Sequence, residues 1–149
     1  MTRSHRLSRG SDPRARIASV LAKASSRPLA LLGPTGCGKT TLLRSALRSR
    51  GTEALWRTAF DLVGSLVQAI QDERLDEYRA GFAADRRPLV LEHLEDLRER
   101  PRTRIEIAKL LKAREVRGNP VLLTLTAARR VEDVVDWLHG CADVIDLSA

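Results

Sequence analysis

One segment of the chain fits a phosphate-binding pattern at every position. Residues 33–40 read GPTGCGKT, which is G-x-x-x-x-G-K-[ST], and they lie between an apolar run and a helical pattern. The glycines at positions 36 and 38 permit backbone conformations that a Cβ atom excludes, so that successive N–H groups converge on phosphate oxygens at a helix start. In such a loop Lys39 brings a positive charge to the β- and γ-phosphates, and the Thr40 hydroxyl binds Mg²⁺. The sequence therefore predicts binding of ATP or ADP with Mg²⁺ through Gly33, Pro34, Thr35, Gly36, Cys37, Gly38, Lys39, Thr40 and Thr41.

Short apolar runs alternate with helical patterns along the whole chain. The expected strands lie at residues 27–32, 54–56, 88–91, 120–126 and 143–147. The expected helices lie at residues 13–24, 39–49, 61–80 (in two pieces split near Asp72), 103–117 and 131–139. The runs are continuously apolar, which is typical of parallel strands covered on both faces. We therefore predict an α/β fold of the P-loop NTPase type, a three-layer sandwich with a five-stranded parallel sheet and helices on both faces.

Capping signals predict where several of these helices begin and end. Asp12 precedes Pro13, a favourable pair for the start of the first helix. Residues 103–106, Thr-Arg-Ile-Glu, have the form of a capping box. Gly118 and Gly140 are the expected C-terminal stops of the last two helices.

Length and composition limit the class of protein. The chain has 149 residues, of which 43% are hydrophobic, and this fits one domain with a real core. No apolar stretch approaches the ~18 residues that span a bilayer, and the N-terminus lacks the apolar run of a secretory signal. The two cysteines are too far apart to indicate a disulfide framework or a zinc site. We therefore expect a cytoplasmic protein with no membrane partner.

The net charge of +7 is concentrated at the N-terminus. Residues 1–16 contain five arginines and one acid, Asp12, while the remainder of the chain is close to balance. We expect a basic flexible tail at residues 1–11, followed by one nucleotide-binding core at residues 12–149. A basic tail attracts nucleic acid or acidic lipid, or it is simply solvated, and composition leaves both readings open.

A second acidic site is expected at the end of a buried strand. Nucleotide hydrolysis on a phosphate loop requires one acid near Mg²⁺ and a second group that orients the attacking water. The strand at residues 88–91 is followed directly by Glu92 and His93. Glu92 is the expected Mg²⁺ ligand, directly or through water, together with Thr40. His93 occupies the position of the second group, where a neutral imidazole lacks a fixed negative charge. Glu95 is an alternative stand-in, but one residue in two on this segment points away from the site.

These pieces, in this order, resemble the AAA+ domain of the bacterial replication initiator DnaA and its shorter relatives, over residues 28–147. The resemblance rests on GPTGCGKTTLLRSAL at the phosphate loop, on helical residues 60–79, on PLVLEHLEDL around Glu92, and on RTRIEIAKLLKAREVRGNPVLLTLT. It implies an ATP-binding core, with Thr126 or alternatively Thr124 as a polar sensor at the end of the fourth strand. It also implies contact of residues 60–79 with single-stranded DNA, but acids are interleaved with Arg74 and Arg79 there.

Departures from the family pattern concern hydrolysis. Glu92 replaces the usual Asp, His93 replaces a second acid, and no arginine follows Arg130 where the family supplies an arginine finger. The sequence given ends at Ala149, before the position of the family's helical lid and duplex-DNA-binding domain. We therefore expect weak or absent ATP hydrolysis, with Glu92, His93 and Thr126 as the candidate catalytic residues.

Three functions follow from these observations. The first is an ATP-binding DnaA-like protein that regulates or helps replication initiation, with a replication initiator or another AAA+ protein as partner, with DNA as a further partner, and with a bacterial, nucleoid-associated location. The second is a small P-loop phosphotransferase. The third is a non-enzymatic interaction protein with a relict P-loop.

Overall fold

The computed structural model describes residues 12–22 and 27–147. The predicted basic tail at residues 1–11 and the predicted end of the first helix at Ala24 lie outside these residues. No helix in the part of the chain that the structure describes has the length and apolar character that crossing a bilayer requires.

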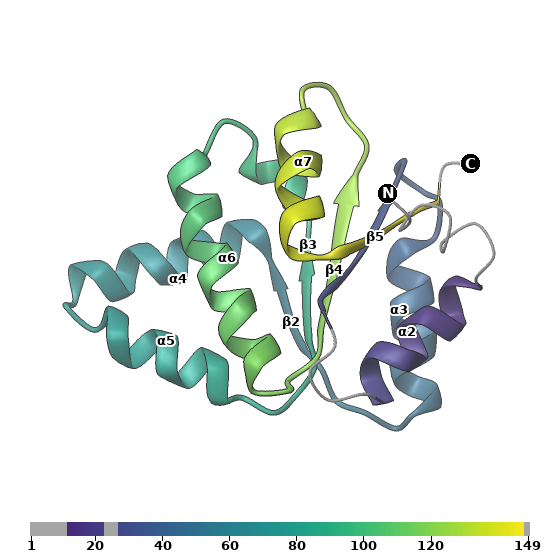
Figure 1. Ribbon diagram of the computed structural model, residues 1–149, viewed down its shortest axis with the longest axis horizontal. Coiled ribbons are helices and arrows are strands. Elements are labelled where there is room, and N and C mark those ends of the chain that lie inside the picture. The colour runs from purple at the N-terminus through teal and green to yellow at the C-terminus, as the bar shows by residue number, and fades with distance from the viewer. Residues whose placement is uncertain (1–11, 23–26, 148–149) are drawn as a thin grey trace.

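The sheet has five parallel strands (Figure 1). They are β1 (Leu29–Gly33), β2 (Leu55–Thr58), β3 (Leu89–Glu92), β4 (Val121–Thr126) and β5 (Asp143–Asp146). Their order across the sheet is β2-β3-β4-β1-β5, and every neighbouring pair is parallel. This confirms the predicted α/β class and all five predicted strands. In this order the carboxyl end of β1, which leads into the phosphate loop, lies beside the carboxyl end of β4, and β3 follows on the far side of β4.

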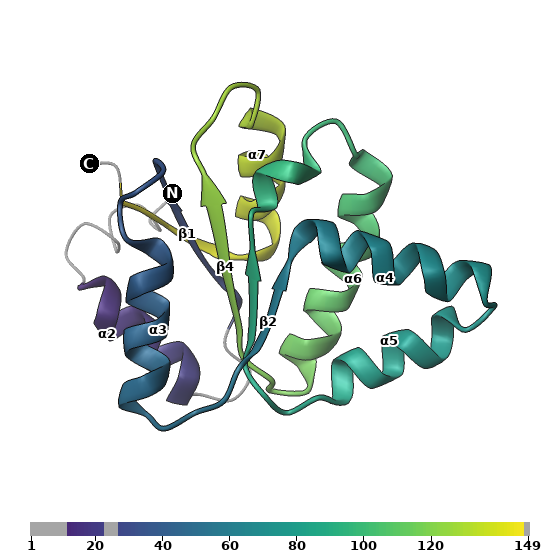
Figure 2. The same ribbon diagram turned by 180° about the vertical axis from the view of Figure 1, so that it is seen from behind.

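Helices cover both faces of the sheet, as Figures 1 and 2 show from opposite sides. The helices α2 (Pro13–Ala22) and α3 (Lys39–Ser49) pack together on one face. The other face carries α4 (Ala59–Gln71), α5 (Leu75–Ala84), the 3₁₀ helix η1 (Leu94–Leu97), α6 (Pro101–Val116) and α7 (Glu132–Cys141). The three predicted layers are therefore confirmed, as is the split of the 61–80 region into two helices, because Asp72 caps the end of α4.

Two separate cores explain why the strands are continuously apolar. Side chains alternate across a strand, and here both faces are covered. In β3, Leu89 and Leu91 pack with the helices α4 to α7, whereas Val90 packs with α2 and α3. In β4, Leu123 likewise packs with the helices α4 to α7, and Leu122 packs with α2 and α3. Each strand therefore needs apolar residues at consecutive positions rather than at alternate ones.

Two of the predicted helix ends are wrong. The capping box at residues 103–106 does not form, because α6 begins at Pro101, a residue well suited to the first helical position, and Thr103 lies inside the helix. The carboxylate of Glu106 pairs with Arg79 instead. Gly140 does not end α7, which runs on to Cys141 and leaves through the extended residue Ala142 directly into β5. The predicted cap at Asp12 is confirmed by a 3.1 Å hydrogen bond from the Arg14 amide.

A buried arginine, which the sequence did not predict, holds the connection from α5 to β3 in place. Arg114 on α6 is fully buried, and its guanidinium donates to the carbonyl oxygens of Phe82 at 2.9 Å and Asp85 at 3.0 Å. It also donates to the carbonyls of Arg87 and Pro120, which precede β3 and β4. Burial lowers the pKa of Arg114 from its ordinary value. One side chain thus ties the α5–β3 connection to α6 and to the start of β4.

Candidate functional site

The predicted phosphate loop joins β1 to α3. Gly36 and Gly38 have φ values of 82° and 93°, in the left-handed region that side chains disfavour, and Gly38 is the N-cap of α3. A Cβ atom on Gly33 would lie 2.6 Å from the sulfur of Cys37, so this position is closed to a side chain by close packing. The loop therefore takes the conformation that its glycines predicted, with the start of a helix behind it.

Lys39 is held inside this loop. It is only 8% exposed, and its ammonium donates to the carbonyl oxygens of Gly33 at 2.9 Å and Pro34 at 3.0 Å. The Cys37 sulfur lies 3.7 Å from the same nitrogen. The charge is thus kept at the loop by neutral acceptors, without a carboxylate partner, and is available for an anion.

Thr40 and Glu92 meet in front of the loop. Thr40 lies in the first turn of α3, and Glu92 is the last residue of β3. The Thr40 hydroxyl donates to Oε2 of Glu92 at 2.6 Å. A hydroxyl and a carboxylate oxygen are the donors that Mg²⁺ prefers, so this pair fits the cation that the sequence predicted. With the Lys39 ammonium in the same loop, the group can hold a metal–phosphate unit.

His93 turns the chain at the end of β3. Its φ of 64° is left-handed, which is uncommon for a residue other than glycine and is found at functional sites. Its backbone N–H donates to the Thr124 hydroxyl of β4 at 3.3 Å. Its ring nitrogen Nδ1 lies 3.1 Å from Oε2 of Glu95. The imidazole is thereby oriented by a carboxylate, although its side chain is 53% exposed.

Glu95, the alternative to His93 in the sequence, joins the site. Read as a continuing strand, residues 93–95 would direct alternate side chains away from the site, but the chain forms the 3₁₀ helix η1 there. The Glu95 side chain is 14% exposed, and its Oε1 accepts a 2.9 Å hydrogen bond from the Thr126 amide. A left-handed residue followed by a tight helix therefore brings a second carboxylate beside Glu92. The only sequence signal for it was the density of acids at residues 92–96.

A cavity of about 440 Å³ unites these groups. It is lined by Thr35, Gly36, Gly38, Lys39, Thr40, Thr41, Glu92, His93, Glu95, Thr124 and Thr126. The structure thus brings most of the predicted nucleotide and catalytic residues to one place. Gly33, Pro34 and Cys37 are not in the lining; they lie behind it and contact Lys39. Both sensor candidates, Thr124 and Thr126, line the cavity.

A second cavity of about 410 Å³ lies between α4 and α5. Its lining includes Ser65, Tyr78 and the ion pair between Arg74 and Glu77. It contains no glycine-rich loop and its arginine is already paired, so it offers nothing comparable for a triphosphate. We therefore assign the nucleotide chemistry to the cavity at the phosphate loop.

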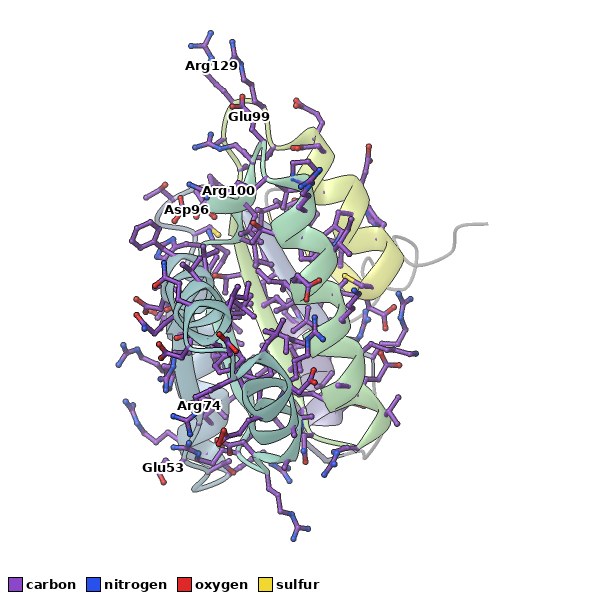
Figure 3. All side chains as sticks on the ribbon, turned by 90° about the vertical axis from the view of Figure 1, so that its left-hand side faces the viewer. Glu53, Arg74, Asp96, Glu99, Arg100 and Arg129 are labelled. Carbon is purple, nitrogen blue, oxygen red and sulfur yellow. The ribbon has the colours of Figure 1, made fainter. Side chains whose placement is uncertain are left out.

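The last arginines before α7 do not line this cavity. Arg129 and Arg130 occupy the β4–α7 loop, and Figure 3 shows Arg129 projecting from the end of the molecule. Arg130 lies 3.7 Å from the Glu99 carboxylate, and Arg98 donates to the Arg129 carbonyl. No arginine lines the cavity in the described part of the chain. The mixed charges of this region therefore pair with one another, as in the Arg104–Asp133 ion pair at 2.9 Å.

Comparison with known proteins identifies the fold. No protein-family model matches the chain, and no curated protein sequence matches it. Domain III of the Thermotoga maritima replication initiation protein DnaA is similar, with a TM-score of 0.71 and 15% identity over 99% of this chain and 68% of that chain. A replication initiator DnaA bound to AMPPCP and single-stranded DNA gives a TM-score of 0.67 and 20% identity, over 88% of this chain and 44% of that one. The DnaC helicase loader gives 0.62 and 16%, over 91% of each chain.

Proposed function

The chain has the fold of a DnaA-like AAA+ core, and from this premise we propose that it binds ATP or ADP with Mg²⁺ and acts as a regulator or helper in bacterial DNA replication initiation. We place the nucleotide-binding core at residues 12–149, with a basic tail at residues 1–11. One observation carries the nucleotide part of this proposal. The Lys39 ammonium and the Thr40–Glu92 pair come from separate elements and line one cavity.

Each group has a role that its position supports. The backbone amides around Gly36 and Gly38 cradle phosphate oxygens. Lys39 exchanges its two carbonyl acceptors for phosphate oxygens, which bind an ammonium more strongly because they are charged. Thr40 and Glu92 hold Mg²⁺, directly or through water, and the cation neutralises phosphate charge when bound. Thr126 or Thr124 contacts the far end of the triphosphate.

Hydrolysis is slow in this proposal. His93, which follows Glu92, is a base without a fixed negative charge. Both carboxylate oxygens of Glu95 are already engaged, Oε1 by the Thr126 amide and Oε2 by the His93 ring. An arginine finger contributes about 10³–10⁵ in rate where it operates, and residues 137–142, where the resemblance would place one, contain no arginine. The residues that line the cavity therefore support the binding of ATP better than they support its hydrolysis. The protein therefore acts mainly through its nucleotide-bound state.

The named neighbours suggest the biological setting. One is an initiator bound to AMPPCP and single-stranded DNA, and another is a helicase loader. This chain spans less than half of that initiator's length, so the initiator's other activities do not transfer with the fold. We propose a replication initiator or another AAA+ protein as the partner, in the bacterial cytoplasm and near the nucleoid.

A non-enzymatic interaction protein remains the second candidate, and one observation favours it. The outer side of α4 exposes Phe60 (70%), Val67 (47%) and Ile70 (55%), which suits a protein partner that does not depend on nucleotide. The phosphotransferase alternative gains no comparable support, because the described cavity lining has no arginine for a transferred phosphoryl group.

The experiment that tests the proposal combines ATP and ADP affinity with single-turnover hydrolysis, each with and without single-stranded DNA. We expect micromolar affinity and hydrolysis that is slow under all conditions. Complex formation with a purified replication initiator is measured with and without ATP. Folded protein that binds no nucleotide would contradict the proposal, and a complex that Lys39→Ala leaves unchanged would select the interaction protein.

A further inference from the structure

Outside the N-terminal tail the charges nearly balance, but basic and acidic residues are distributed unequally between the two faces of the sheet. Residues 12–58 contain 9 of the 26 lysines and arginines but only 2 of the 19 acids. The two helices on one face, α2 and α3, contain no acidic residue at all. The helices on the other face, α4 to α7, each contain at least one. The face covered by α2 and α3 is therefore basic as a whole.

The arginines of this face are directed to solvent. In α3, Leu43 and Leu47 are buried against the sheet, whereas Arg44 and Arg48 are exposed. Residues four apart lie above one another on the same side of a helix. Arg50 caps the end of α3 and is exposed, and Arg14 is exposed on the neighbouring helix α2. We call Arg14, Arg44, Arg48 and Arg50 the arginine face.

These four guanidinium groups have no acidic partner among residues 12–22 and 27–147. The ion pairs of that part of the chain involve other arginines, such as Arg79 with Glu106 and Arg104 with Asp133. Arg44 instead lies over the Trp56 ring, 5.2 Å from its centroid. What distinguishes this face is that α2 and α3 contain no acid, whereas on the other side of the sheet acids are interleaved with the arginines.

We propose that the arginine face binds the phosphate backbone of nucleic acid without reading the base sequence. Guanidinium groups are planar forks that match phosphate oxygens in two-point hydrogen bonds, which is why arginine is favoured over lysine for this ligand. Bases are recognised by stacking on several exposed aromatic rings or by groove contacts. The one ring here, Trp56, is half-buried beneath Arg44, so the surface offers charge rather than base readout.

The same surface is poorly suited to a membrane. Binding at an acidic bilayer combines basic residues with exposed apolar side chains that enter the interface. The large exposed hydrophobic residues of the described chain are Phe60, Val67, Ile70, Ile105 and Val116, all on α4 or α6 across the sheet. A polyanion that needs only charge and hydrogen bonds is the better match. The arginines of the N-terminal tail, Arg3, Arg6 and Arg9, are joined in sequence to the start of α2 and add to the same attraction.

This surface is separate from the nucleotide site. Helix α3 begins in the phosphate loop with Lys39, and the arginine face occupies its later turns and its end. None of the four arginines lines the nucleotide cavity. The proposed nucleic-acid binding therefore does not depend on ATP binding, and an experiment can refute either one without refuting the other.

The test measures fluorescence anisotropy of labelled oligonucleotides with the full chain across a series of salt concentrations. Single strands and duplexes of two unrelated sequences are compared, using Arg44→Glu/Arg48→Glu and the matched control Lys109→Glu/Lys112→Glu on α6. Both pairs of exposed cations are replaced with the same change in charge. We expect Arg44→Glu/Arg48→Glu to weaken binding at least about tenfold for all sequences and to reduce the salt slope by about 2, because two phosphate contacts are lost.

Controls separate folding, nucleotide binding and overall charge. The neutral variant Arg44→Gln/Arg48→Gln should give an intermediate loss, and circular dichroism should show native helix content in every variant. Lys39→Ala should retain nucleic-acid binding while losing ATP. Equal weakening by both charge-reversed pairs, no nucleic-acid binding by the wild-type protein, or binding to anionic vesicles in place of oligonucleotides would each overturn the proposal.

Discussion

The Thr40 hydroxyl donates a 2.6 Å hydrogen bond to Oε2 of Glu92, a residue 52 positions later in the chain. One group comes from the first turn of the helix after the phosphate loop, and the other from the end of β3. The sheet order places β4 between β1 and β3, and the contact is made across the carboxyl ends of these strands. Both oxygens are suitable Mg²⁺ ligands, so this contact links the fold to the proposed chemistry.

Glu92→Gln should remove most of the benefit that Mg²⁺ gives to ATP binding. The amide keeps the size of the side chain but loses the charge that holds the cation, and we expect the Mg²⁺-dependent gain in affinity to fall about tenfold. The measurement is ATP affinity with Mg²⁺ and with EDTA. Asp96→Asn removes the same charge from an exposed neighbour and serves as the control. Equal Mg²⁺ dependence in wild type and Glu92→Gln would refute the assignment.

His93→Asp should raise the rate of hydrolysis. Aspartate tolerates the left-handed backbone at this position, where φ is 64°, and it restores a fixed negative charge beside Glu92. We expect the single-turnover rate to rise at least about tenfold, since a positioned general base contributes 10²–10⁴ in rate. His93→Asn fits the same backbone without charge and should show no rise. If both variants hydrolyse ATP equally slowly, the neutral imidazole is not what limits turnover.

Arg114→Met should destabilise the fold without touching the cavity. The carbonyl oxygens of Phe82, Asp85 and Arg87 lose the guanidinium donor on replacement, whereas that of Pro120 keeps the Leu89 amide as a donor. Buried unsatisfied acceptors are costly, and we expect the free energy of unfolding to fall by about 3 kcal/mol. Chemical denaturation measures this, with the exposed Arg117→Met as the control, which should change stability by less than about 0.5 kcal/mol. If Arg114→Met also lowered the free energy of unfolding by less than about 0.5 kcal/mol, the hydrogen bonds of Arg114 would not stabilise the connection from α5 to β3.

Asp85 should contribute stability that is lost only in acid. Its side-chain hydrogen bond with Arg87, at 2.7 Å, lowers the pKa of Asp85 from 3.8 to about 2. Because the folded pKa is below the unfolded one, the contribution is present above about pH 4 and disappears as the pH falls toward 2. Unfolding midpoints of wild type and Asp85→Asn should therefore differ at pH 7 and converge near pH 2 to 3. A difference that stays constant over this range would contradict the ion pair.

Much of the fold could be predicted because its local signals agree with its tertiary structure. The five apolar runs became the five strands, since a sheet covered on both faces needs apolar residues such as Leu89 and Val90 in succession. The phosphate loop was predictable because its glycines are required by a backbone shape, and Gly36 and Gly38 adopt it. Lys39 and Thr40 followed from the same pattern.

The remaining features depend on contacts between distant segments. Arg114 looked like one more charge on a helix, and only the converging carbonyls of two segments make its burial favourable. Glu95 enters the site because His93 turns left-handed and η1 follows, which periodicity does not reveal. The false capping box at Thr103 failed because Pro101 begins the helix two residues earlier. The unequal charge of the two faces could not be predicted, because it depends on α2 packing beside α3 on one face of the sheet.

The central claim, that the loop from Gly33 to Thr40 binds nucleotide, is tested most directly by calorimetric titration of ATP·Mg²⁺ into wild type and Lys39→Ala. Lys109→Ala on α6 removes the same charge from a solvent-exposed position and is the control. We predict one site of micromolar affinity in wild type and Lys109→Ala, and no measurable heat of binding in Lys39→Ala with the fold intact by circular dichroism. Well-folded wild-type protein that takes up no ATP or ADP, or a Lys39→Ala variant that binds as tightly as wild type, would contradict the account.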